Sequence, residues 1–186
     1  MLVIAIIGIL AFIGISTFSS VTKSMKLDIA GDMLVSAVKQ QQGLAKSGKG
    51  ESAGGEVSPL CYGMHFEVTD KGAQVSSIKT KYVSIGQNKA DYCEEVNDVK
   101  LVDYEAATDY KIFSIAINDN EESRPIDILF KPPFAKVEVK ADGNVIDGIK
   151  KIVITIGPLT TGEERQYLIF EPAAGLIYKT NKPGGQ

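Results

Sequence analysis

The chain begins with an apolar run, continues as an amphipathic stretch and ends in a long series of short apolar segments separated by turns. Residues 1–15 (MLVIAIIGILAFIGI) contain no charged side chain and no hydrogen-bonding side chain. As a helix this run would be about 22 Å long, whereas the hydrocarbon core of a bilayer is about 30 Å thick. The pattern is typical of most of a membrane span, which we assign to residues 1–20.

Three interpretations compete for this run. A secretory signal peptide has a basic region and a small-residue cleavage site; here only the amino terminus supplies positive charge, and no such site follows. A buried helix of a soluble domain normally has one polar face, which this run lacks. A membrane-anchoring helix fits best. Its orientation stays open, because Lys23 and Lys26 favour a cytoplasmic carboxyl end whereas a basic leader before Met1 would favour the opposite.

From residue 21 to residue 47 the pattern becomes that of an amphipathic helix continuing the first one. Apolar residues recur at every fourth position: Met25, Ile29, Met33 and Ala37. We predict that these four side chains pack the helix against a sheet of the same chain. Gly31 weakens the helix by about 1 kcal/mol relative to alanine without ending it. Clustered glycine, serine and lysine then predict a linker over residues 48–59.

Residues 60–178 are predicted to form a β-rich head. The predicted strands are residues 60–68, 74–78, 81–85, 111–118, 126–130, 136–140, 151–156, 166–170 and 176–178. Short strands separated by turn residues favour antiparallel sheets. The predicted fold class is α+β: a long amino-terminal helix, whose first half spans a membrane, packed on an antiparallel β-sheet head. Residues 179–186 (KTNKPGGQ) are expected to be a flexible tail.

The segment VIAIIGILA, residues 3–11, resembles the amino-terminal helix of type IV pilins and type II secretion pseudopilins. In that family a peptidase site, an aromatic first residue and an acidic residue precede such a run. The resemblance therefore implies about six further residues before Met1, which would lengthen the span to roughly 31 Å. Residues 61–66 (CYGMHF), 128–139 and 169–177 are similar to strands of H-type minor pseudopilins and related minor pilins.

The resemblance implies a minor pilin or pseudopilin, a structural subunit of a type IV pilus, a competence pilus or a type II secretion pseudopilus. Its implied partners are other pilin-like subunits, the bacterial inner membrane, and an assembly platform with its ATPase, with the head outside the cytoplasm. The residues expected to exchange lipid for neighbouring helices are Leu2, Val3, Ile4, Ile6, Ile7, Gly8, Ile9, Leu10, Phe12, Ile13, Gly14 and Ile15. The alternative is a single-pass, membrane-anchored extracytoplasmic binding domain that does not polymerise.

Composition narrows the function classes further. The chain has 186 residues and a net charge of −3, which does not favour nucleic-acid binding; a weak DNA contact by the two lysines of the tail is the lesser alternative. The two cysteines and one histidine match no zinc-ligand spacing. In an exported domain Cys61 and Cys93 are therefore predicted to form a disulfide, and the alternative is two separate buried thiols.

No catalytic motif is present, neither a nucleophile elbow, a zincin helix, a P-loop nor a dinucleotide-binding fingerprint. His65 lies in an alternating strand without a partner set nearby in the sequence, so we predict a structural or surface role. The acidic turn at residues 118–122 lacks the order and glycine of an EF-hand and is predicted to be a solvated hairpin tip. We therefore expect no enzymatic activity and no cofactor.

Overall fold

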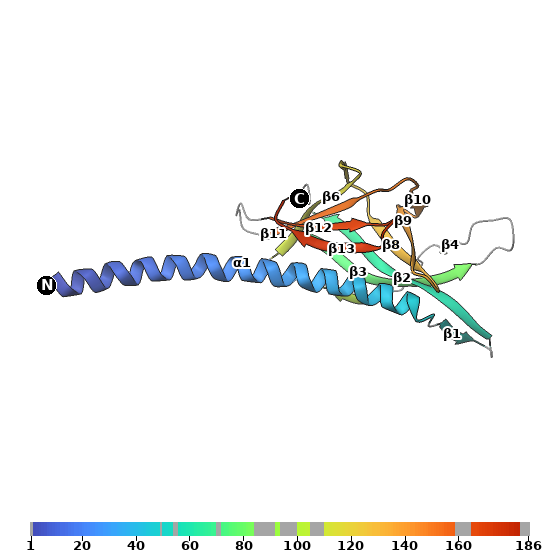
Figure 1. Cartoon of the computed structure of the whole chain (residues 1–186), viewed down its shortest axis with the longest axis horizontal. Coiled ribbons are helices and arrows are strands. Elements are labelled where there is room, and N and C mark those ends of the chain that lie inside the picture. Colours follow the sequence, from blue (N-terminus) through green and yellow to red (C-terminus); the bar gives the residue numbers. More distant parts are fainter. Residues whose placement is uncertain are drawn as a thin grey trace.

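The chain forms one long helix followed by strands. The computed structural model describes the backbone of residues 2–48, 50–53, 56–69, 72–83, 92–93, 100–104, 110–158 and 165–182. It describes side chains in residues 21–48, 50, 59–68, 75–80, 82, 93, 112–158 and 165–182. Helix α1 (Leu2–Lys46) is 45 residues long. Its first part extends beyond the strands and its second part lies along them (Figure 1).

The described strands form two antiparallel sheets. The first sheet runs in the order β10-β9-β8-β2-β3-β4, with β1 added to β2 and β5 added to β3. Its strands are β1 (Gly50–Ala53), β2 (Glu56–Thr69), β3 (Gly72–Val83), β4 (Tyr92–Cys93), β5 (Lys100–Tyr104), β8 (Ile126–Lys131), β9 (Lys136–Ala141) and β10 (Asn144–Val145). The second runs β13-β12-β11-β6-β7. Its strands are β6 (Tyr110–Ile117), β7 (Asn120–Glu122), β11 (Ile152–Pro158), β12 (Gln166–Glu171) and β13 (Leu176–Thr180).

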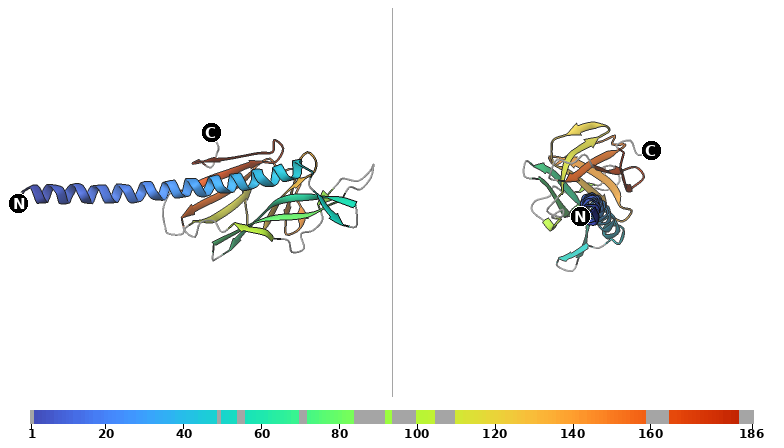
Figure 2. Two further views of the ribbon diagram at one scale, coloured as in Figure 1. Left: turned by 90° about the horizontal axis from the view of Figure 1, so that it is seen from below. Right: turned by 90° about the vertical axis from the view of Figure 1, so that its left-hand side faces the viewer.

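The second half of α1 packs across both sheets. It contacts β2 and β8 of the first sheet and β11, β12 and β13 of the second, and it lies along one side of the head (Figure 2). The core beneath it joins all three layers; Phe130 of β8 and Phe170 of β12 meet edge to face with ring centroids 6.0 Å apart. The predicted α+β class, with a helix on antiparallel sheets, is confirmed.

Several strand predictions differ from the structure in extent. The expected linker at residues 48–59 instead contains β1 and the beginning of β2, which pair with each other. The predicted strands at 74–78 and 81–85 belong to one continuous strand, β3, as far as Val83; residues 84–85 lie outside the described residues. Strands β4, β5, β7 and β10 were not predicted. Strands β1 and β7 are short and polar, so no apolar pattern in the sequence predicts them. They are strands because their backbones pair with β2 and β6, respectively.

The predicted helix-to-sheet stripe is wrong at three of its four positions. Met25, Ile29 and Met33 are 60%, 55% and 51% exposed, whereas Ala37 is buried. With 3.6 residues per turn, a residue every fourth position advances by about 40° around the helix, so a stripe that begins on the outer side reaches the sheets only after several steps. The buried face is formed instead by Leu27, Ala30, Leu34, Ala37, Val38 and Ala45.

Gly31 lies where α1 packs against the side chain of Gln166. A Cβ atom at this position would collide with Oε1 of Gln166, which is buried on β12. Glycine at this position therefore leaves room for the Gln166 side chain between α1 and the second sheet.

Candidate functional site

The most unusual surface of the molecule is an exposed apolar stripe on α1. It consists of Val21, Met25, Ile29 and Met33, which are all at least half exposed. At about 100° per residue its centre lies roughly opposite the buried face that contacts the sheets. Between residues 21 and 33, α1 therefore carries apolar side chains on two sides, and the head covers only one of them. We call these four residues the outer stripe.

Polar contacts fix the direction in which the outer stripe faces. Lys179 on β13 donates to Asp28 Oδ1 at 2.6 Å and lies 2.7 Å from Asp32 Oδ2. Gln166 Nε2 also donates to Asp28 Oδ1, at 3.1 Å. The hydrogen bonds from Lys179 and Gln166 hold the pKa of Asp28 below its usual range. These contacts join α1 to the second sheet from one flank of the outer stripe.

The outer stripe continues, along the same helix, from the apolar run of the sequence. The backbone of residues 2–20 is helical and belongs to α1. The side chains of the predicted assembly residues, from Leu2 to Ile15, lie outside the described part of the structure. Among the side chains that are described, no helical segment is long and apolar enough to cross a membrane.

The predicted disulfide between Cys61 and Cys93 is confirmed. Both residues are fully buried, with their Cα atoms 6.0 Å apart, and they pack with Ile78 and Leu129 on the face of the first sheet that points away from α1. The bond holds the short strand β4 against β2, and a disulfide is the expected state of such a pair in an extracytoplasmic domain.

A buried polar cluster also holds β4. Lys140 Nζ donates to the carbonyl oxygen of Cys93, and Glu138 Oε1 accepts from the Cys93 amide at 3.3 Å. Glu138 also pairs with Lys131 at 3.0 Å. The disulfide and the ionic cluster therefore fasten the same two-residue strand, which explains why Glu138 and Lys140 of β9 are buried here.

His65 has a partner that the sequence did not indicate. Its Nδ1 lies 2.7 Å from Asp127 Oδ1 on the neighbouring strand β8, and its Nε2 lies 3.8 Å from Glu67 Oε2. Ser76 is opposite His65 on β3, but its hydroxyl is buried and bonds to no group in the described structure. Asp127 is placed to orient the imidazole ring of His65. The hydroxyl of Ser76, however, is buried and offers a substrate no approach.

Stability should depend on pH through this pair. The hydrogen bond to Asp127 raises the pKa of His65, so its contribution is complete below the ordinary histidine pKa of about 6.5 and is lost as the pH rises through the folded value. We expect the stability of wild type relative to His65→Gln to fall as the pH rises from about 6 to about 8.5. Urea unfolding at both pH values measures this difference. A constant difference would show that the pair does not couple to folding.

The acidic turn at residues 118–122 is a hairpin tip whose groups pair with the protein. Asn118 Oδ1 accepts from the amide of Lys150 at 2.8 Å, and Asp119 Oδ1 lies 3.0 Å from Lys151 Nζ. Hydrogen bonds from Arg124 lower the pKa of Glu122 to about 2. In the part of the chain that is described, no cluster of histidine, cysteine, aspartate and glutamate side chains could hold a metal ion.

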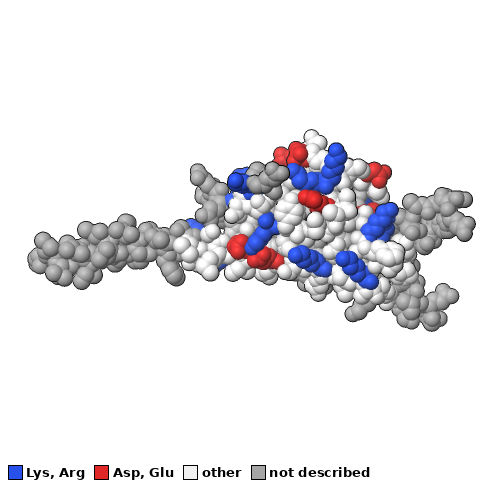
Figure 3. Space-filling model, viewed as in Figure 1, with Lys and Arg blue, Asp and Glu red and all other residues white. Residues whose placement is uncertain are grey.

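The face of the head drawn in Figure 3 has no extended patch of a single charge among the described residues. Basic and acidic residues are interspersed over the head in the view of Figure 3.

Compared with models of protein families, with curated proteins and with solved structures, the chain gives no match. The interpretation of function therefore depends on the geometry of this chain, and its clearest feature is the outer stripe.

Proposed function

We propose that the chain is a pilin-like structural subunit, a minor pilin or pseudopilin, which assembles through α1 with other subunits of its kind. The observation that carries the proposal is the outer stripe, an apolar face on a helix whose sheet-facing side is already buried. Exposed apolar patches on a folded protein are typical of protein–protein or membrane contacts. The amino-terminal segment VIAIIGILA, which resembles the family's helix, lies on the same helix.

The proposed mechanism is a transfer of the helix from lipid to protein. The apolar run anchors the subunit in the inner membrane, and the family's assembly platform and ATPase then move it into a bundle of like helices. There, residues 2–15 exchange lipid for side chains of neighbouring subunits. The outer stripe extends this contact into the region covered by the head, and the head, outside the cytoplasm, selects neighbours. No step requires a cofactor or a reaction catalysed by the chain.

An aspartate in the outer stripe tests the proposal. Ile29→Asp places a charge on a face that assembly would bury, so we expect incorporation into sheared pili or pseudopili to fall about tenfold. The isolated variant should unfold within about 0.5 kcal/mol of wild type, because Ile29 is exposed. Ile29→Leu, which keeps an apolar side chain, is the matched control and should assemble normally.

Two outcomes would count against the proposal. Normal incorporation of Ile29→Asp would show that the outer stripe is not an assembly surface. A membrane-anchored protein of normal abundance that never enters a polymer, even as wild type with the cognate assembly machinery, would favour the anchored binding domain instead.

A further inference from the structure

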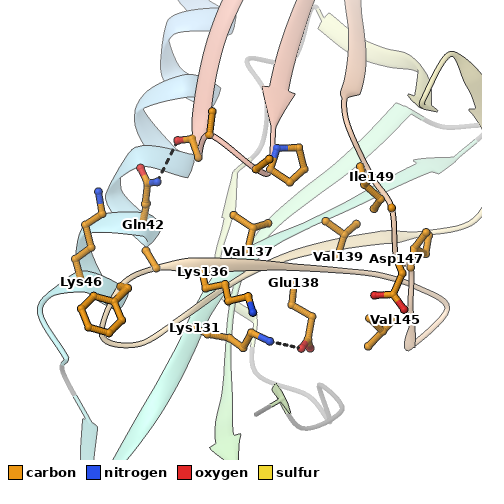
Figure 4. A pocket seen from close by; sticks show the side chains of 18 residues that line it. Gln42, Lys46, Lys131, Lys136, Val137, Glu138, Val139, Val145, Asp147 and Ile149 are labelled. Carbon is orange, nitrogen blue, oxygen red and sulfur yellow. Dashed lines mark hydrogen bonds and ion pairs between the residues drawn. The ribbon is translucent and has the colours of Figure 1, made fainter. Parts of the chain in front are cut away.

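A cavity of about 750 Å³ opens at the end of the head where α1 finishes. Its walls come from the last turns of α1, the β8–β9 loop, the segment 145–149 and the β12–β13 turn (Figure 4). Gln42 Nε2 of α1 donates to the carbonyl oxygen of Gly175 across it, at 3.1 Å. This volume is within the usual range for binding sites, roughly 300–1,000 Å³. The last turns of α1, which line the cavity, lie at the far end of this helix from the apolar run (Figure 1).

Exposed apolar side chains gather around this cavity. Large exposed hydrophobic residues of the described chain occur in two places, the outer stripe and this end of the head, where they are Phe134, Val145 and Leu176. Phe134 and Val145 line the cavity, and Leu176 directly follows its wall residue Gly175. Phe134 is 85% exposed, and the next residue, Ala135, has a φ of 53°, a conformation that costs a non-glycine residue free energy.

The cavity also contains an open sheet edge. Four consecutive residues of β9, from Lys136 to Val139, line it, although their side chains alternate between the two faces. The strand therefore presents its edge to the cavity. On that side β10 pairs only with Lys140 and Ala141, and Val139 accepts one further bond, from the Ile146 amide at 2.9 Å. Because outward-pointing backbone groups alternate along a strand, the N–H and C=O of Val137 also point outward.

Charge is divided between the two ends of the cavity. Lys46 lies at one end and Asp147 at the other, with Lys136 between them on β9 (Figure 4). Lys131 and Glu138 pair with each other. Within the described structure the Lys46 and Lys136 ammonium groups have no ion-pair partner. The last carbonyls of α1 already accept bonds from Ser47 and Gly48, so Lys46 is not required as a cap.

We propose that this cavity binds an extended segment of a partner protein, which adds a strand to the outer edge of β9. Its backbone bonds to Val137, and its alternate apolar side chains lie against Val137, Val139 and Ile149. Its carboxylate, from a carboxyl terminus or an acidic residue, reaches Lys46 and Lys136. An open edge supplies main-chain hydrogen bonds, the apolar floor supplies side-chain sites, and the lysines set the direction of the segment. The proposal is independent of assembly through α1.

The test uses the full-length chain in mild detergent and a library of random hexapeptides with free carboxyl termini. We expect selected peptides to alternate apolar and polar residues and to bind with affinities of about 1–100 μM by fluorescence anisotropy. Methylating the backbone nitrogen that pairs with Val137 should weaken binding at least about tenfold. This comparison uses wild-type protein, so it does not depend on the folding of any variant.

Protein variants then locate the site. Val137→Pro removes an outward N–H from an edge position where proline is tolerated, and we expect at least about a tenfold loss of affinity. Lys46→Glu with Lys136→Glu should lose about as much, whereas Lys39→Glu, on an exposed position of the same helix, should bind within about twofold of wild type. No peptide binding tighter than about 1 mM would overturn the proposal, as would binding that is indifferent to backbone methylation or to Val137→Pro.

Discussion

Replacing Ile7 by aspartate is expected to abolish both membrane insertion and assembly. At the centre of a membrane-spanning helix an aspartate is roughly 3–4 kcal/mol less favourable than an isoleucine. In an assembled bundle the same carboxylate would lie unpaired among apolar side chains, which costs a further penalty of the same order. Alkaline extraction of membranes and immunoblotting of sheared filaments measure the two losses separately.

The control for this experiment is Ile7→Leu, which preserves hydrophobicity and should insert and assemble as wild type does. The head does not depend on Ile7, because its described core begins at Leu27. The Ile7→Asp chain should therefore still form the Cys61–Cys93 disulfide when it is exported. Incorporation of Ile7→Asp at the wild-type level would rule out the lipid-to-bundle mechanism.

Removing the disulfide should cause a large loss of stability in the head. The bond closes a loop of 32 residues. In the chain-entropy description, opening a loop of this size costs about 3–4 kcal/mol. We therefore expect Cys61→Ala with Cys93→Ala to lower the free energy of unfolding by about that amount, measured by urea unfolding followed by circular dichroism.

Reduced wild type provides the comparison for the double variant. Both should lose a similar free energy, since the buried cluster of Glu138, Lys131 and Lys140 remains to hold β4. A loss below about 1 kcal/mol would mean that the polar contacts alone fix β4 and that the loop is already constrained when the chain is unfolded.

Local patterns predicted the elements of this fold well. The apolar and amphipathic runs gave a single helix, and the alternating runs gave most of the strands, because both depend on the periodicity of neighbouring residues. The same reasoning assigned the wrong side of α1 to the sheets, since the helix is apolar on two sides and the sequence does not say which side the head covers. Ala37 is buried and Met33 is exposed because each step of four residues turns by about 40° around the helix axis.

The contacts that define the candidate sites connect residues far apart in the chain. His65 meets Asp127 across 62 positions, and Lys179 meets Asp28 across 151. No local pattern encodes such pairs, which follow from strand order and from the placement of α1. The cavity at the end of the head is assembled from four separate stretches of sequence. The disulfide was predictable because the chain has only two cysteines.

The two proposed surfaces divide the molecule by task. The outer stripe and the apolar run would join the subunit to its neighbours, while the cavity would face outward at the opposite end of α1. A subunit that is exposed at the end of a polymer would leave this cavity free for a partner. Loss of peptide binding in Val137→Pro should therefore leave incorporation into the polymer unchanged, and loss of incorporation in Ile29→Asp should leave peptide binding unchanged.

The most direct test of assembly through α1 is photo-cross-linking in cells that carry the cognate assembly system. A photoreactive phenylalanine replaces Met33 in the outer stripe in one strain and Lys39, also exposed on α1, in another. We expect position 33 to cross-link to other pilin-like subunits in the filament fraction, at least about five times more than position 39 does. Equal cross-linking at the two positions, or no subunit-to-subunit product from position 33, would contradict it.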